Sequence, residues 1–484
     1  MSITSALNSA MSGLRAAGRA SEVVSSNISN AMTPGYARRT LSVSAASQGF
    51  SGGVHVNGIA RHVDSQILSD RRLAGAEFGY RSETTRFLDR VENLLGTPGE
   101  SGSLSGRLSD FENSLITASS RPDATERLEA AALSARDLAQ TINEASNGVQ
   151  KARTEADRMI ASQVEQLNGV LKQVEQINYQ ITSAASKQND TSSLKDQRQT
   201  MIDAISEIVP IRMVPRQNDT VALFSTGGAI LLDGRAAEIG FQSANVVTPY
   251  MTIQDGTLSG LTLNGFAVNT SSASGNLRGG TLGAQFEIRD ERAPDAQTQM
   301  DALARDLIER FESPAVDPSL TAGQPGLFTD SGATFDATLE PGLAGRLSLN
   351  ALVDPTRGGE SWRMRDGLGA TAPGNAGNAE ILNALTDALT EQRAPASGSF
   401  AGTPHSALDL TAALASQVGA DSLREDQKLS FASAQFYEFN QLELAEGVDT
   451  DVELQRLMAI EQAYAANARM IEAVDEMLST LMRL

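Results

Sequence analysis

The chain of 484 residues contains no cysteine, three histidines and one tryptophan, and aromatic residues make up only 5% of it. The absence of cysteine excludes disulfide bonds, thiolate nucleophiles and cysteine-based metal sites. Basic residues are also scarce, because 39 Lys and Arg stand against 59 Asp and Glu and leave a formal net charge of −20. This charge disfavours binding to nucleic-acid phosphates and docking on anionic membranes.

Long apolar runs are absent as well. No stretch of the sequence reaches the roughly 18 apolar residues of a transmembrane helix. The first residues lack the basic start and continuous apolar segment of a secretory signal peptide. We therefore expect no membrane insertion, and any export must use a route without a cleaved signal peptide. Hydrophobic residues make up 40% of the chain, which is enough to build folded cores.

Motifs that carry enzyme chemistry are missing. The histidines form no H-E-x-x-H and no two-histidine-plus-carboxylate pattern, and no phosphate-binding glycine loop occurs. One G-x-S-x-G match, at 49–53, precedes an expected strand rather than a helix, so it is interpreted as a glycine turn. Asp449, Asp451 and Glu453 lack the glycine and the last glutamate of a calcium loop. They suit the positive end of a following helix. We expect no enzyme activity, no cofactor and no metal.

A heptad pattern stands at each end of the chain. Apolar or small residues alternate by four and three from residue 3 to 28, which is the spacing of a coiled-coil seam. A second seam runs from 457 to 481. Together they form the predicted assembly interface, whose main members are Leu7, Leu14, Val24, Ile28, Leu457, Ile460, Tyr464, Ile471, Val474, Leu478 and Leu481.

Neither terminal helix is expected to be stable alone. Burying one Leu or Ile contributes about 1.5–3 kcal/mol, whereas ordering each backbone residue costs about 1–2 kcal/mol. The seams contain several Ala and Ser residues and few large ones. They therefore need partners, which are each other, neighbouring subunits, or both. Two core helices of one ordinary domain would show the same pattern.

Between the heptads the sequence predicts a helical bundle. Helical periodicity is found over 63–95, 104–116, 126–142, 149–185, 195–209, 282–311 and 406–444. Pro294 is expected to kink or split the helix in which it lies.

Two insertions interrupt this bundle. Short apolar runs with glycine turns predict strands at 221–224, 229–232 and 261–263. The segment 314–402 is rich in Gly, Pro and Ala, with convincing elements only at 347–353 and 381–389, and 394–406 is interpreted as a linker.

The predicted fold is mainly α with β-rich insertions. It combines terminal coiled-coil helices, a discontinuous helical bundle and one or two inserted β-rich domains. The predicted domains are a terminal coiled-coil region (1–55 plus 445–484), the bundle (56–210 plus 281–313 plus 403–444), a small β-rich domain (211–280) and a second insertion (314–402).

Four short motifs in order resemble one family. Residues 27–36 resemble the N-terminal signature N-x-x-N-x-x-T-x-G-(Y/F) of flagellar rod, hook and hook-associated proteins. The matching residues are Asn27, Asn30, Thr33, Pro34, Gly35 and Tyr36. The residue before Thr33, commonly Asn in hook-associated members, is Met32 here. Further matches are Asp196-Gln197-Arg198, the glycine-rich segment 279–290 and the helix 461–469. The resemblance covers 1–210, 280–312 and 420–484 and is weakest in 314–402.

The resemblance implies a structural subunit of the bacterial flagellum that joins the hook to the filament as a ring of copies. Its implied partners are further copies of itself, the hook protein, hook-associated protein 3 and an export chaperone at the C-terminal helices. Export through the flagellar type III channel, an extracellular location, and terminal helices that order only on assembly are also implied.

Other interpretations remain open. The chain could be another axial protein such as hook or distal rod, although hook proteins usually carry T-x-G-F and rod proteins are usually shorter. It could also be an axial protein with an enzymatic insertion in 314–402, where no catalytic constellation is visible. Flagellin is disfavoured because its conserved motif after the first helix is absent. A membrane-active helix is disfavoured because Arg15 and Arg19 are the only basic residues of the first helix.

Overall fold

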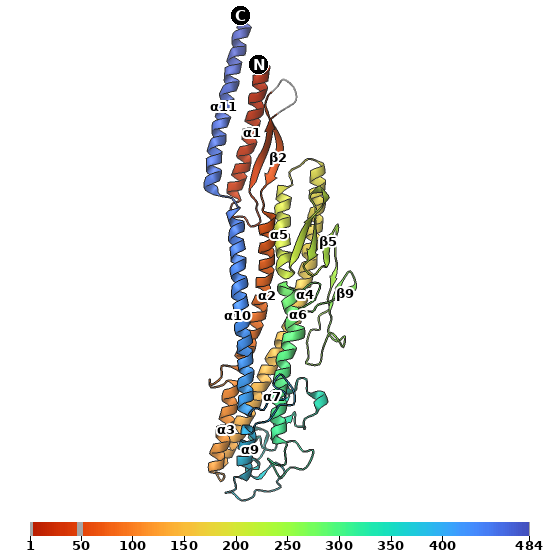
Figure 1. Ribbon diagram of the computed structural model, residues 1–484, viewed down its shortest axis with the longest axis vertical. Coiled ribbons are helices and arrows are strands. Elements are labelled where there is room, and N and C mark those ends of the chain that lie inside the picture. The colour runs from red at the N-terminus through yellow and green to blue at the C-terminus, as the bar shows by residue number, and fades with distance from the viewer. Residues whose placement is uncertain (1–2, 46–51, 484) are drawn as a thin grey trace.

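The chain forms an elongated, largely helical rod with both ends at one tip (Figure 1). The computed structural model describes residues 3–45 and 52–483. The tip consists of α1 (Ile3–Ser29), α11 (Thr450–Arg483) and an antiparallel hairpin of β1 (Arg39–Ala45) and β2 (Val54–Arg61). Helix α1 ends at the predicted place. The strand expected after residue 53 is confirmed, whereas β1 was not predicted.

The shaft of the rod is built from long helices. Helix α2 (Ser65–Leu95) runs beside α10 (Ala407–Ala445), and α5 (Ser192–Ile208) packs on both α2 and α4 (Thr125–Ser186). Side chains fix the helix starts, because Asp64 accepts from the backbone N–H groups of Gln66 and Ile67, and Ser406 forms a capping box with Asp409. The predicted helices of the bundle are thus confirmed at these positions.

One helix corrects the sequence prediction. The helices expected at 126–142 and 149–185 form a single helix, α4 (Thr125–Ser186), which continues through Asn147 and Gly148. The prediction of a break was wrong because glycine weakens an isolated helix by only about 1 kcal/mol. Here Gly148 allows close packing, since a Cβ atom there would lie 2.5 Å from Leu94 Cδ1.

The predicted helix 282–311 is divided, as expected from Pro294. Helix α6 (Gly280–Glu287) continues into a π-helical turn (Ile288–Arg292) and then into α7 (Ala293–Phe311). Pro294 lies at the start of α7, directly after the π-helical turn, and because it has no N–H it cannot donate to a carbonyl of that turn. The short helix α3 (Leu104–Ser120) completes the lower bundle.

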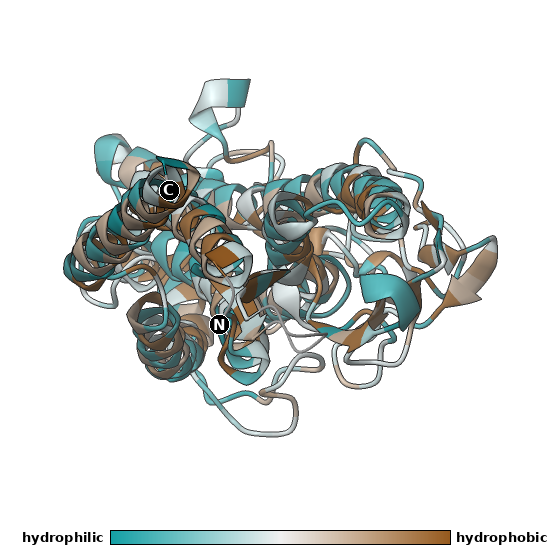
Figure 2. Ribbon diagram, turned by 90° about the horizontal axis from the view of Figure 1, so that it is seen from above, coloured by the Kyte–Doolittle hydropathy of each residue, from teal (hydrophilic) through white to brown (hydrophobic). Residues whose placement is uncertain are grey.

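The region after α5 contains two small antiparallel sheets. One has the order β3-β4-β5-β6, formed by Ile211–Pro215, Val221–Ser225, Ile230–Asp233 and Arg235–Ala236. The other has the order β7-β8-β9, formed by Ile239–Gly240, Leu261–Leu263 and Phe266–Val268. The three predicted strands are confirmed. The sheets lie on the flank of the rod away from α11 (Figures 1 and 2).

The segment 314–402 is more ordered than its sequence indicates. It contains the pair β10 (Phe328–Asp330) and β11 (Leu347–Leu349), then α8 (Arg363–Asp366) and α9 (Glu380–Thr390). Its buried side chains, such as Phe328 and Leu382, belong to the same apolar cluster as α3, α4 and α7. Short 3-10 turns lie at Gln217–Asp219, Ala337–Leu339, Leu343–Gly345 and Pro355–Arg357.

The segment 394–406, interpreted as a linker, connects α9 to α10 without a helix or strand of its own, but its ends are fixed. Arg393 and His405 pair as an antiparallel bridge, and the buried Arg310 donates to the carbonyl oxygens of Ala388, Glu391 and His405 at 2.8 Å each. The small polar residues of this segment suggested a flexible chain, but an arginine from α7 holds its two ends together. The predicted fold class, mainly α with β-rich insertions, is confirmed.

Candidate assembly interface

The family motif forms a buried joint at the lower end of α1. Asn27 is fully buried, and its Oδ1 accepts from the backbone N–H of Arg39 at 3.0 Å and from the Tyr36 hydroxyl at 2.9 Å. Its Nδ2 donates to the Arg39 carbonyl at 2.8 Å and to Glu453 Oε2 at 3.0 Å. One amide side chain therefore uses its full hydrogen-bonding capacity to connect α1, β1 and α11.

The rest of the motif makes the turn that follows α1. Asn30 accepts from the Thr33 hydroxyl at 3.3 Å and also from the Thr33 backbone N–H at 2.9 Å through its carbonyl. Gly35 has φ +75°, a left-handed conformation that favours glycine. A Cβ atom at Gly35 would lie 2.4 Å from Thr200 Oγ1, so the turn packs directly on α5.

Asp196, from the second matching motif, anchors the joint to α5. Its carboxylate binds Arg39 Nη2 at 2.5 Å and Arg61 Nε at 2.6 Å, and both arginines lie on the β1–β2 hairpin. The Arg39 guanidinium also lies 4.7 Å from the centre of the Tyr36 ring. Both arginines and Asp196 are largely buried, so these ion pairs are screened less by salt than surface pairs are.

Glu453 is a buried member of this joint that the sequence did not predict. It was interpreted as an acidic helix-start residue, yet it is 1% exposed and bonds both Asn27 and Arg456. Sequence alone places Glu453 in the first turn of α11, but only the packing of α11 on α1 shows that it is buried. Asp449 caps the start of α11, because its Oδ1 accepts from the backbone N–H groups of Asp451 and Val452.

The other matching motifs also lie at buried contacts between elements. Arg198 donates to Asn178 Oδ1 and to the Asp219 carbonyl, and burial lowers its pKa to about 10. Arg289 has no exposed side-chain surface and binds Asp157 and Asp290. Burial raises the pKa of Asp290 above its ordinary value. Buried pairs of this kind act as fixed connections, because losing one partner leaves an uncompensated charge.

The two terminal helices pack on each other along much of their length (Figures 1 and 2). Of the predicted interface residues, Val24 and Val474 are buried, while Tyr464, Leu478 and Leu481 are 46%, 39% and 57% exposed. The remaining members are half-buried, namely Leu7, Leu14, Ile28, Leu457, Ile460 and Ile471. The structure thus brings the two seams together but leaves them partly uncovered.

A second apolar stripe on α11 was not anticipated. Its residues recur at intervals of seven, four and three, and all of them are exposed: Val452, Ala459, Ala463, Ala466, Met470 and Met477. In contrast to the seam, this stripe has no partner within residues 3–45 and 52–483, since α1 covers the adjacent face. Across its 34 residues α11 buries only Glu453 and Val474.

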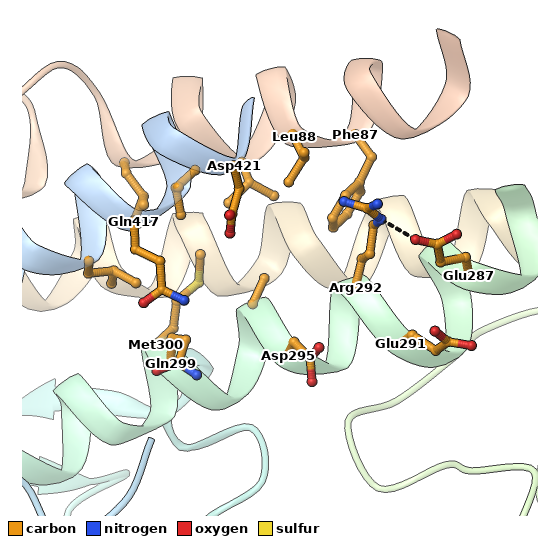
Figure 3. Close-up of a pocket in the computed structure, with 15 residues that line it drawn as sticks. Phe87, Leu88, Glu287, Glu291, Arg292, Asp295, Gln299, Met300, Gln417 and Asp421 are labelled. Atoms are coloured by element: carbon orange, nitrogen blue, oxygen red, sulfur yellow. Dashed lines mark hydrogen bonds and ion pairs between the residues drawn. The ribbon is translucent and has the colours of Figure 1, made fainter. Parts of the chain in front are cut away.

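A cavity of about 530 Å³ lies further down the rod, between α2, α7 and α10 (Figure 3). Its floor is apolar, and its rim carries the carboxylates of Glu287, Glu291, Asp295 and Asp421 together with Arg292. The Arg292 Nε donates to Glu287 Oε1 at 2.6 Å. No pattern in the sequence predicted this cavity.

No group of three or more His, Cys, Asp or Glu side chains within the described residues could hold a metal ion. His62 bonds Thr40 at 2.7 Å, and His405 packs against Phe400. Positions 49–51 of the G-x-S-x-G match lie outside the described residues. Among the helices that the structure describes, none has the length and apolarity needed to cross a bilayer.

Comparisons with known proteins agree with these motifs. Residues 88–315 match the model of the flagellar hook-associated protein FlgK helical domain. Residues 7–36 match the flagella basal body rod protein model, and 445–484 match the flagellar basal body rod FlgEFG protein C-terminal model. Flagellar hook-associated protein 1 of Bacillus subtilis is 24% identical over 98% of this chain and 96% of that protein. The chain is thus similar to flagellar hook-associated protein 1 over nearly its whole length, and to the FlgK helical-domain model over just under half of it.

Further members of the hook-associated protein 1 family align over shorter ranges. The protein of Salmonella typhimurium is 31% identical over 49% of this chain and 44% of its own length. That of Escherichia coli is 24% identical over 64% of this chain and 57% of its own length. The structure of the flagellar hook junction protein FlgK from Burkholderia pseudomallei has a TM-score of 0.45 at 19% identity, over 55% of this chain and 47% of that one. These similarities support a structural role in the flagellar axis.

Proposed function

We propose that this chain joins the hook to the filament and assembles with neighbouring copies through α1 and α11. The observation that carries the proposal is the surface of α11, whose seam is half-covered by α1 and whose second stripe is uncovered. Exposed apolar side chains at heptad spacing are typical of helices that pack against another helix. Repeated contacts of this kind between copies form a closed ring or an open helical lattice.

The domain division is part of this proposal. The terminal region (1–55 plus 445–484) carries the axial contacts, and the buried joint of Asn27, Asp196 and Glu453 sets its orientation relative to the bundle (56–210 plus 281–313 plus 403–444). The insertions 211–280 and 314–402 lie along and below the bundle, away from the tip (Figure 1). In this arrangement the tip packs into the axis and the remaining domains surround it.

The proposed partners are those that the resemblance to hook-associated proteins implies. They are further copies of the chain, the hook protein, hook-associated protein 3 and an export chaperone that covers the C-terminal helices before assembly. A covering partner suits α11, since exposed methionine and leucine side chains favour aggregation of a free chain. The proposed location is extracellular, after export without a cleaved signal peptide.

Substitutions on α11 test the assembly proposal. We expect Leu478→Asp in the seam and Met470→Asp in the second stripe to abolish junction formation and motility, because each places a charge in an apolar contact. The melting of the soluble chain should barely move, since these residues are 39% and 51% exposed.

The matched control is Met458→Asp. Met458 is 57% exposed and lies on neither stripe of the same helix, so this variant should assemble. Complementation of a strain lacking the protein, scored by motility and by filaments shed into the medium, provides the measurement. Normal assembly by both stripe variants would overturn the proposal. Incomplete rods without hooks in the strain that lacks this protein would instead indicate a rod protein.

A further inference from the structure

Methionine carries all the sulfur of this chain, which contains 13 methionines and no cysteine. Four of the methionines lie within the 34 residues of α11, namely Met458, Met470, Met477 and Met482. Their exposed fractions are 57%, 51%, 50% and 86%. Thioethers react with oxidants in proportion to their exposure. Helix α11 is therefore a part of the molecule where oxidation of the free chain is expected to concentrate.

Met470 and Met477 belong to the second apolar stripe of α11. They are seven residues apart, so they lie on one face of the helix, about 10.5 Å from each other along its axis. The exposed Ala466 and Ala473 are their neighbours on this face, and these side chains are too short to shield a thioether. Helix α1 lies between α11 and the β1–β2 hairpin and covers the adjacent face of α11 (Figure 1).

A neutral hydroperoxide is the class of oxidant that suits this surface. The chain has a formal net charge of −20, which repels an anionic oxidant but not hydrogen peroxide. The peroxide transfers one oxygen atom to the thioether sulfur, so that an S–O bond forms as the O–O bond breaks. The sulfur is oxidised by two electrons, and the proton of the transferred oxygen passes to the departing hydroxide, which leaves as water. The product is methionine sulfoxide, whose side chain is polar.

A sulfoxide would not fit the contact that the stripe forms on assembly. Its oxygen is a hydrogen-bond acceptor, and an acceptor buried without a donor weakens an association. The other members of the stripe, Val452, Ala459, Ala463 and Ala466, have no side-chain donor to offer. The same position therefore tolerates a thioether but disfavours its oxidised form.

We propose that Met470 and Met477 are oxidation sites, and that their sulfoxides block assembly of the free chain. Once neighbouring copies cover the stripe, the same two thioethers are shielded from peroxide. The inference rests on the proposed function, because that function places the stripe between copies. Met458 provides the internal comparison, since it is as exposed as the other two but lies on neither stripe.

Peptide mass spectrometry after treatment of the full chain with hydrogen peroxide tests the sites themselves. Met458, Met470 and Met477 should be converted to sulfoxide, while Met300 and Met364 should stay reduced, because these two are 2% and 1% exposed. Oxidation of Met470 and Met477 no faster than that of Met300 would overturn the assignment.

Sedimentation of the treated chain with isolated hooks, taken from a strain that lacks the protein, tests the effect on assembly. We expect oxidation to weaken this binding by at least about tenfold. Treatment with both methionine sulfoxide reductases, one for each sulfoxide epimer, should restore it. Unchanged binding by a chain that is oxidised at both Met470 and Met477 would overturn the inference.

Variants decide which methionines are responsible. In a chain with both Met470→Leu and Met477→Leu, peroxide should change binding less than about twofold relative to the same variant before treatment, because leucine is apolar and has no sulfur. Met458→Leu is the matched control and should lose binding on treatment as the natural chain does. An equal loss in the double variant would place the critical oxidation elsewhere and overturn the inference.

The same sedimentation assay separates this inference from the proposed function. If Met470→Asp abolishes binding to hooks but oxidation does not, the stripe is an assembly contact and only the inference fails. If the untreated natural chain does not sediment with hooks, the proposed function fails and the inference fails with it.

Discussion

Gly35 meets two separate constraints at the joint between α1 and the rest of the chain. Its φ of +75° is strained for other residues, and the space beside it is filled by Thr200 Oγ1, 2.4 Å from an ideal Cβ position. Gly35→Ala should therefore loosen the joint through both strain and collision. Gly99→Ala separates the two effects, because Gly99 has φ +88° but no atom within 4 Å of its Cβ position.

The expected outcome is a larger loss of the free energy of unfolding in Gly35→Ala than in Gly99→Ala. The two backbone strains are similar, at roughly 1 kcal/mol each. The difference between the variants thus reports the contact with α5. Equal losses in the two variants would show that Gly35 acts through its backbone angle alone.

Asp301 provides a pH-dependent contribution to stability at the level of one side chain. It accepts from the backbone N–H groups of Gly342 and Ala344 and from Gln297, but burial outweighs these bonds and raises its pKa to about 6. Because the folded pKa lies above the unfolded value of 3.8, the stabilising contribution is complete below about pH 4 and is lost as the pH rises through about 6.

Asp301→Asn removes this titration while keeping the shape of the side chain. The free energy of unfolding of the natural chain, relative to that of the variant, should fall by about 2 kcal/mol between pH 4 and pH 7. Denaturant unfolding at several pH values measures it. A gap between the two proteins that stays constant over this range would contradict the assignment to Asp301.

Two glycines within α4 bear on why this helix is continuous. Gly148 lies where Leu94 of α2 approaches, whereas Gly169, in the same helix, has no atom within 4 Å of its Cβ position. Gly169→Ala should stabilise the chain by about 0.5–1 kcal/mol through helix propensity. Gly148→Ala should destabilise it by about 1–3 kcal/mol, because the added methyl group overpacks against Leu94.

Thermal unfolding of the two variants beside the natural chain gives the comparison. Stabilisation by both would mean that Leu94 moves aside freely and that the α2–α4 contact does not depend on glycine. Opposite signs would show that tertiary packing, rather than local propensity, placed glycine at 148.

The same distinction explains how far the sequence predicted the elements. Periodicity located α1, α2, α3, α5 and α10 because each has an apolar stripe and a local start or stop signal. It divided α4 wrongly because the packing that compensates for Gly148 comes from α2. It also missed three features that depend on residues distant in the chain. Strand β1 pairs with the strand that contains Arg61, the burial of Glu453 depends on Asn27, and the order of 394–406 depends on Arg310. The cavity is formed by three separate helices and leaves no local pattern.

At the scale of the whole molecule, the tip and the shaft differ in how they are stabilised. The shaft contains two large buried clusters of aliphatic and aromatic residues, whereas residues of α11 contribute to neither cluster. Regions with few buried apolar contacts open at low free energy even when their helices are formed. The tip is therefore expected to open far more readily than the shaft in the free chain.

Amide hydrogen exchange on the free chain and on isolated hook–filament junctions tests this expectation. Residues of α11 beyond Asp449 should exchange quickly in the free chain, while those of α4 stay protected. In the assembled junction, α1 and α11 should become protected together, because neighbouring copies would then cover Met470, Met477 and the half-covered seam. Strong protection of both tips in the free chain, equal to that of α4, would mean that α1 alone suffices to hold α11. In that case α11 would already be stable in the free chain. Covering its exposed stripe would then not be what orders the tip, and the stripe could not be the contact that drives assembly.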